Sequence, residues 1–240
     1  MITPFERAIK SDQYDLGDLL WVKEGRADTT RTGYFWEYLE PYVEGWKGKT
    51  VLDIGAGTGW LVSKALEKGA VKAVGIEPAK NNVAQGLQDH PEVSLVNASL
   101  EAFDGMGEHF DRIVAVMSFS HIADIDSAFS KIRSMIDDIG ELILLVPDYD
   151  YFKIQRHDYQ IETQEIDADQ YAVSVTRPSG TLADIIRRPS VYINAAEHAG
   201  FKLLEEKPMP PTETQMVRAP KYATVKNQAL TQLLRFRVAQ

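Results

Sequence analysis

The middle of the chain carries short runs of consecutive apolar residues, separated by segments whose apolar residues have helical spacing. Five such runs, rich in valine, isoleucine and leucine, are 50–55, 71–76, 93–96, 112–117 and 141–146. Continuous apolar runs are typical of strands that are buried on both faces, as in a parallel sheet. Strand, helix and strand repeated at this rhythm predict right-handed crossovers and a doubly wound α/β sheet.

The clearest helical pattern lies over residues 124–140, between the last two runs. Asp124 or Asp126 can cap its start, and Gly140 can close its end in the left-handed conformation. The apolar residues at spacings of three and four predict one buried helix face. They are Ile125, Phe129, Ile132, Ile136 and Ile139.

A glycine-rich motif, "VLDIGAGTG" at 51–59, lies where the first predicted strand turns into its helix. Glycine can take positive φ and lets the backbone approach a ligand closely, which suits Gly55, Gly57 and Gly59. Ligands of doubly wound sheets bind beyond the carboxyl ends of the strands. The motif therefore predicts a ligand site at this edge of the sheet, with a ligand-free tight turn as the alternative.

The residues around the motif favour S-adenosylmethionine over a dinucleotide. Dinucleotide sites prefer G-x-G-x-x-G, and here Trp60 stands where the third glycine would fall. Asp53 would repel a pyrophosphate but attract the ammonium and sulfonium groups of S-adenosylmethionine. Glu77 ends the second predicted strand, 20 residues after Gly57, where an acid accepts hydrogen bonds from ribose hydroxyls.

These segments resemble the class I S-adenosylmethionine-dependent methyltransferases over roughly residues 49–147. The resemblance is carried by "VLDIGAGTG", "VGIEP", "FDRIVAVMSFSHI" and "GELILLVPD". The later segment "IIRRPSVYINAAEHAGFKLLEEKPMPP" is similar to the tail of the small-molecule, ubiquinone-biosynthesis-like group. The resemblance implies a Rossmann-like methyltransferase fold with a mostly parallel seven-stranded sheet, in which "LLRFRVAQ" is the last, antiparallel strand.

The same resemblance implies which residues hold the cofactor. Asp53 contacts the amino group, often through water, Glu77 binds the ribose, and Pro78 lies against the adenine. Ser99 stands where family members often carry an acid that contacts the adenine amine, and Met117 lies beside the adenosyl group. The expected cofactor-binding residues are Tyr14, Asp53, Gly55, Ala56, Gly57, Gly59, Glu77, Pro78, Ser99, Leu100 and Met117.

Methyl transfer itself asks little of side chains, because the sulfonium is already activated. The enzyme supplies alignment and exclusion of water, and alignment alone can contribute about 7–11 kcal/mol. Where the acceptor must lose a proton, His121 is the candidate general base, since an unperturbed imidazole pKa of about 6.5 suits neutral pH. The alternative is that His121 only shapes the pocket. His121 and Asp124 alone are too few ligands for a metal site, so no metal is expected.

The flanking segments complete the expected organisation. Residues 1–48 are rich in aromatic side chains and resemble a helical lid, and residues 49–240 form the cofactor-binding methyltransferase domain. Residues 150–190 form a small β insertion after strand five that roofs the substrate pocket, with a pair of strands within 159–180. Arg187 and Arg188 bind a substrate carboxylate or phosphate in one interpretation, and are exposed and solvated in the other.

Composition narrows the function further. With 26 basic and 35 acidic residues the formal net charge is −9, which repels a phosphate backbone, so no nucleic-acid partner is expected. The absence of cysteine excludes disulfides and a thiolate nucleophile. Without a signal sequence or an apolar run of about 18–20 residues, we expect a soluble, cytoplasmic protein with no membrane partner.

The sequence as a whole predicts methyl transfer from S-adenosylmethionine to an oxygen, nitrogen or carbon atom of a small molecule, by a monomer or homodimer. Three alternatives remain at this stage. One is a methyltransferase that acts on a macromolecule. The second is an S-adenosylmethionine-binding protein without transferase activity, and the third is an NAD-dependent oxidoreductase.

Overall fold

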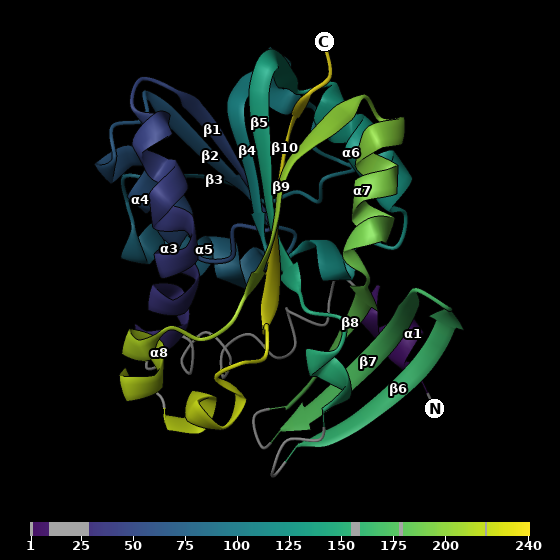
Figure 1. Ribbon diagram of the computed structural model, residues 1–240. Coiled ribbons are helices and arrows are strands. Elements are labelled where there is room, and N and C mark those ends of the chain that lie inside the picture. The colour runs from purple at the N-terminus through teal and green to yellow at the C-terminus, as the bar shows by residue number, and fades with distance from the viewer. Residues whose placement is uncertain (1, 10–28, 155–158, 178–179, 219) are drawn as a thin grey trace.

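A computed structural model describes residues 2–9, 29–154, 159–177, 180–218 and 220–240 of the chain. Its main feature is a seven-stranded sheet in the order β3-β2-β1-β4-β5-β10-β9 (Figure 1). The first five strands pair in parallel, and β10 runs antiparallel to both of its neighbours. The strands are β1 (Thr50–Ile54), β2 (Lys72–Ile76), β3 (Ser94–Val96), β4 (Phe110–Val116), β5 (Ile136–Pro147), β9 (Phe201–Met209) and β10 (Thr231–Val238). The expected doubly wound, mostly parallel sheet and its antiparallel last strand are confirmed.

Helices cover both faces of this sheet (Figure 1). On one face, residues of α3 and α4 pack in one apolar cluster with Val51 of β1. On the other, residues of α6 and α7 pack with Leu52. Because both faces are covered, the inner strands are apolar at successive positions. The helices are α1 (Pro4–Ala8), α3 (Thr29–Val43), α4 (Trp60–Glu67), α5 (Lys80–Asp89), α6 (Ile125–Arg133), α7 (Pro189–His198) and α8 (Glu213–Arg218). Within the described residues, no helix is both long enough and apolar enough to cross a membrane.

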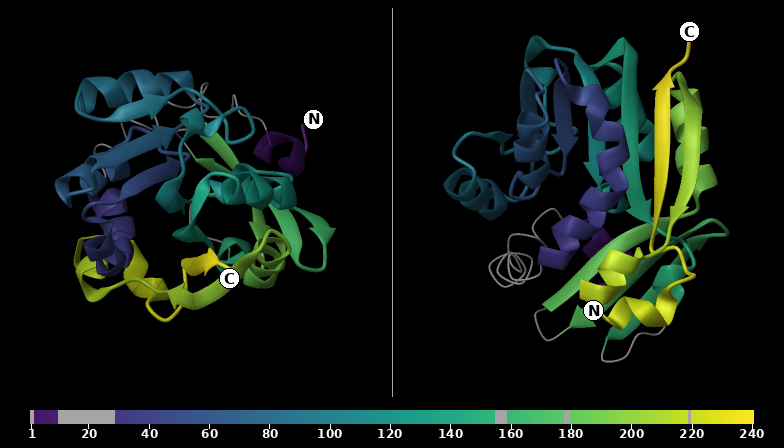
Figure 2. Two further views of the ribbon diagram at one scale, coloured as in Figure 1. Left: turned by 90° about the horizontal axis from the view of Figure 1, so that it is seen from above. Right: turned by 60° about the vertical axis from the view of Figure 1, so that its left-hand side comes forward.

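A second, antiparallel sheet is inserted between β5 and α7 and lies beyond the carboxyl ends of the parallel strands (Figures 1 and 2). We call it the roof. It consists of β6 (Gln160–Asp167), β7 (Gln170–Arg177) and β8 (Gly180–Arg187). The sequence predicted only a pair of strands here. The third strand was missed because Asp184 and Arg187 interrupt its apolar pattern.

The described parts of the predicted lid pack in two different places. The short helix α1, whose Thr3 and Glu6 form a capping box, places Ala8 against Ala183 and Ile185 of the roof. The second part, α3, packs on the large sheet instead. Residues 10–28, with Tyr14, lie outside the described residues.

One predicted helix is too long. The helix α6 ends at Arg133, and β5 begins at Ile136. Asp124 caps the helix by accepting from the Ser127 amide at 3.0 Å. The predicted core residue Ile139 is 74% exposed, and Gly140 lies inside the strand rather than at a helix end. Pairing of Ile136 with Phe110, followed by a register shift, outweighs the helical spacing of the isoleucines.

Candidate active site

The glycine motif forms a tight turn between β1 and α4. Gly55, Gly57 and Gly59 have φ values of +74°, +57° and +80°, a region that residues with a Cβ rarely adopt. A Cβ on Gly55 would lie 2.3 Å from the Cβ of Ser118, so the turn is pressed against the segment that follows β4. A Cβ on Gly57 would meet nothing within 4 Å. The turn is therefore closed at Gly55 and open at Gly57.

The amides of this turn are already used by the end of β2. Gly55 and Ala56 donate to the Ile76 carbonyl at 2.9 and 3.0 Å, and Gly57 donates to Glu77 Oε2 at 2.9 Å. A site for pyrophosphate needs such N–H groups to point at the ligand. The hydrogen bonds of the turn therefore argue against a dinucleotide.

Glu77 is held rigidly at the end of β2. Its side chain is 6% exposed, and in addition to the bond from Gly57 its Oε1 accepts from the Ala79 amide at 2.9 Å. Asn97 Nδ2 donates to the carbonyl groups of Glu77 and Pro78, at 3.0 and 2.9 Å. Backbone amides thus fix both carboxylate oxygens of Glu77 in place. Sequence analysis missed Asn97, although a polar side chain directly after β3 is a usable signal.

Asp53 lies near the end of β1 and is 3% exposed. Burial, and then the neighbouring charge of Glu77, raise its pKa to about 8. Both effects disfavour the ionised carboxylate of Asp53, and a nearby positive charge would stabilise it. The ammonium and sulfonium groups of S-adenosylmethionine would supply that charge beside two neighbouring buried acids. The carboxylates of Asp53 and Glu77 therefore fit the positive charge of that cofactor.

The remaining predicted cofactor residues follow the carboxyl ends of β2, β3 and β4. Pro78 is exposed, Ser99 Oγ accepts from the Ala102 amide at 3.4 Å, and the Leu100 side chain is buried in the core. Met117 has φ of +59°, and its amide donates to the Leu145 carbonyl at 2.7 Å. Left-handed backbone in a residue other than glycine stores strain, which is common at functional sites.

His121 ends a short 3₁₀ turn after β4 and contacts the roof. Its Nε2 lies 3.4 Å from Oδ1 of Asp184 on β8, and its side chain is 22% exposed. Burial lowers its pKa, whereas the Asp184 carboxylate and the carbonyl groups of Ala8 and Ala183 act in the opposite direction and Arg187 lowers it further. The imidazole is therefore neutral at pH 7. Among the described residues, no group of three or more histidine and acidic side chains could hold a metal ion.

The expected roles of the two arginines do not hold for Arg187. Its side chain is 2% exposed, and its guanidinium donates to one side chain and three backbone carbonyl groups. These acceptors are Gln170 Oε1 at 2.8 Å and the carbonyls of Phe119 at 3.2 Å, Ile122 at 2.7 Å and Ala123 at 3.2 Å. Arg187 is thus neither solvated nor open to a substrate anion. Arg188 is 45% exposed and forms an ion pair with Asp169 at 3.1 Å.

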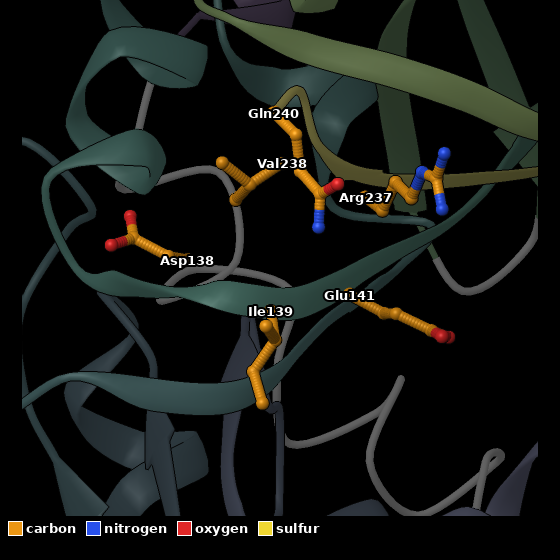
Figure 3. A pocket seen from close by; sticks show the side chains of 6 residues that line it. All are labelled: Asp138, Ile139, Glu141, Arg237, Val238 and Gln240. Carbon is orange, nitrogen blue, oxygen red and sulfur yellow. The ribbon is translucent and has the colours of Figure 1, made fainter.

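A hollow of about 190 Å³ lies at the opposite edge of the sheet, where β5 begins and β10 ends (Figure 3). Its lining is polar apart from two aliphatic side chains. The lining residues are Asp138, Ile139, Glu141, Arg237, Val238 and Gln240. Because ligands of parallel sheets bind beyond the carboxyl ends of the strands, this hollow does not belong to the candidate active site.

The sheet order, the glycine turn and the two acids at the ends of neighbouring strands define a class I S-adenosylmethionine-dependent methyltransferase fold. A family model for a methyltransferase domain matches residues 35–206, and the chain belongs to this family. The expected methyltransferase class is thereby confirmed, and S-adenosylmethionine as its cofactor is part of the proposal below.

Individual proteins show the same likeness at lower coverage. A tRNA U34 carboxymethyltransferase of Shewanella loihica is 30% identical over 129 residues, which is 50% of this chain and 38% of that protein. A ubiquinone biosynthesis O-methyltransferase of Azorhizobium caulinodans is 32% identical over 102 residues, 41% of this chain and 40% of that protein. The chain matches half or less of the length of these curated relatives. An S-adenosylmethionine-dependent methyltransferase from Mesorhizobium loti, 16% identical, shares the fold with a TM-score of 0.65 over 83% of this chain and 97% of that one.

Proposed function

We propose that the chain binds S-adenosylmethionine between the ends of β1 and β2 and transfers its methyl group to a small-molecule acceptor under the roof. The observation that carries the proposal is the buried pair Asp53 and Glu77 beside the open side of Gly57. When bound, the cofactor supplies a methyl group on a sulfonium. The formal charge of −9 supports a small acceptor, because it disfavours a polyanionic one.

Each predicted residue then has a defined task. Asp53 compensates the positive charge of the cofactor, and Glu77, fixed by two backbone amides, accepts from the ribose hydroxyls. The turn through Gly55, Ala56, Gly57 and Gly59 leaves room for the methionine and ribose portion. Pro78, Ser99 and the amide of Leu100 border the adenine, and Met117 lies beside the adenosyl group.

For an acceptor that carries a proton, His121 is the residue that takes it. A neutral imidazole accepts a proton, and burial keeps the His121 ring neutral at pH 7 by lowering its pKa. His121 lies four residues beyond Met117, in the segment that contacts the glycine turn through Ser118 and Gly55. His121 would take the acceptor proton as the acceptor gains the methyl group, the carbon–sulfur bond would break, and the cofactor would leave as S-adenosylhomocysteine.

Calorimetric titration with S-adenosylhomocysteine tests the cofactor site. We expect micromolar binding, and Glu77→Gln should weaken it at least tenfold, since the amide loses a charged acceptor and one acceptor oxygen for the backbone. Glu67→Gln, at an exposed ion pair on α4, is the matched control and should leave affinity unchanged. Folded wild-type protein that does not bind S-adenosylhomocysteine would contradict the proposal.

A macromolecular acceptor is the second candidate, because several relatives at 25–30% identity are named tRNA U34 carboxymethyltransferases. Filter binding with unmodified tRNA at about 50 and 200 mM salt separates the two. We expect no saturable binding below about 100 μM, since the acidic chain offers little phosphate neutralisation. Micromolar binding that weakens steeply between the two salt concentrations would favour the tRNA acceptor instead.

A further inference from the structure

The outer strand of the roof lies against the segment that follows β4. β8 is an edge strand of the three-stranded sheet, and it contacts the 3₁₀ turn Phe119–His121. Two side chains of β8 make this contact, and they carry opposite charges. Arg187 binds backbone carbonyls of the segment, and Asp184 binds its side chains.

Asp184 lies between two polar side chains of the turn. Its Oδ1 accepts from Ser120 Oγ at 2.8 Å and is 3.4 Å from His121 Nε2. Ser120 Oγ is also 3.4 Å from His121 Nε2, so the three groups are mutual neighbours. Ser120 is fully buried, and the Asp184 side chain is 18% exposed. A carboxylate in this position favours a proton on the nitrogen that faces it.

We propose that Asp184 is a positioning residue, which orients the imidazole of His121, keeps a proton on its Nε2 and stabilises its protonated form. The consequence for methyl transfer rests on the function proposed above for His121. The roof would then do more than cover the acceptor, because one of its strands supplies the carboxylate that holds the proton-accepting side chain.

The other groups around the imidazole do not replace Asp184. From β8 the ring faces the Ala183 carbonyl and the charge of Arg187, and from α1 it faces the Ala8 carbonyl. Asp184 is the anionic group among these neighbours. Arg187 has its own acceptors in the segment that follows β4 and so keeps β8 docked when Asp184 is changed. Removal of the Asp184 charge therefore tests positioning rather than folding.

The test follows the imidazole directly, in ¹⁵N-histidine-labelled full-length protein. The chain has five histidines, and a His121→Gln sample assigns the resonance of His121. We expect the Nε2–H tautomer in the wild type. Asp184→Asn should lower the pKa of His121 and shift its tautomer ratio, because the carboxylate raises that pKa. Glu162→Gln, an exposed roof position on β6, is the matched control and should change neither.

Two further variants test whether the carboxylate of Asp184, rather than its neighbour Ser120, sets the tautomer of His121. Asp184→Glu should restore the tautomer in part, and Ser120→Ala, which leaves the carboxylate in place, should keep it. An identical His121 titration in the wild type and in Asp184→Asn would overturn the proposal. S-adenosylhomocysteine affinity, measured on the wild type and on Glu162→Gln, should differ by less than twofold. Absence of that affinity in the wild type contradicts the proposed function alone, because the titration of His121 needs no cofactor.

Discussion

Asp53→Asn is expected to weaken S-adenosylhomocysteine binding by about 30- to 150-fold. The substitution removes the buried carboxylate that would bind the ammonium group, and a hydrogen bond to a charged partner contributes about 2–3 kcal/mol in such a site. Calorimetric titration at pH 8 measures the change, with Glu67→Gln as the control for a surface acid. An asparagine side chain cannot replace the charge, so an affinity within threefold of the wild type would show that Asp53 does not bind the cofactor.

The same substitution should stabilise the protein without cofactor. Folding raises the pKa of Asp53 to about 8, whereas the unfolded chain has a value near 3.8. The stability that this group contributes is therefore fully present below pH 3.8 and is lost as the pH rises to 8. At pH 7 the cost is on the order of 2–4 kcal/mol, and asparagine avoids it. Thermal unfolding should show a Tm several degrees higher at pH 7, and a smaller gain at pH 5.

Cofactor affinity should also depend on pH through Asp53. Because a cationic ligand favours the ionised carboxylate, binding below pH 8 releases a proton. Wild-type affinity for S-adenosylhomocysteine should therefore rise from pH 6 to pH 8, by at most about tenfold per pH unit, and then level off. Titrations in two buffers of different ionisation enthalpy count the released proton. Asp53→Asn should lose both the slope and the proton release, and a slope that survives in this variant would assign it to another group.

Gly55→Ala and Gly57→Ala should have different effects, although the two glycines are only two residues apart. At Gly55 a Cβ would lie 2.3 Å from the Cβ of Ser118, in a backbone with φ of +74°. Overpacking and left-handed strain together should destabilise the fold by about 3–5 kcal/mol. Urea denaturation of the purified variant measures this loss. A loss below about 1 kcal/mol would mean that the turn and the Ser118 segment separate easily.

At Gly57 only the strain applies, because a Cβ there meets nothing within 4 Å. Gly57→Ala should cost about 1–2 kcal/mol of stability. It should weaken S-adenosylhomocysteine binding at least tenfold, since the new methyl group would enter the space proposed for the ligand. Unchanged affinity in a folded Gly57→Ala variant would contradict that placement. Comparison of the two variants thus distinguishes the glycine whose packing stabilises the turn, Gly55, from the glycine that faces the proposed ligand, Gly57.

The parallel sheet could be predicted from the sequence because its strands are buried on both faces. Each apolar run, such as 71–76 for β2, falls within a few residues of an observed strand. Residues 136–140 were assigned to a helix because their isoleucines continue the spacing of α6. What decides their structure is pairing with Phe110, a partner distant in sequence, which no local pattern encodes.

In the candidate site, too, some residues could be predicted from the sequence and others could not. Asp53, Glu77 and the glycines follow from a local motif, because one turn and two strand ends bring them together. Ser118 and Asn97 were not singled out, since they act on backbone carbonyls: Ser118 Oγ donates to the Ile54 carbonyl at 2.6 Å. The contacts of Asp184 and Arg187 with the segment after β4 could not be predicted, because the residues that they join are more than 60 positions apart in the chain.

The buried guanidinium of Arg187 also limits how such enzymes can be recombined. Because the roof is a continuous insertion between β5 and α7, a chimera could exchange it as one segment. Its docking, however, depends on three carbonyl groups in the connection between β4 and α6. A chimera that exchanges the roof alone would place the Arg187 guanidinium against the connection of another protein. Its N–H donors would then lack acceptors, which costs stability in a buried position. An exchange of the roof would therefore need to move residues 117–124 together with residues 159–188.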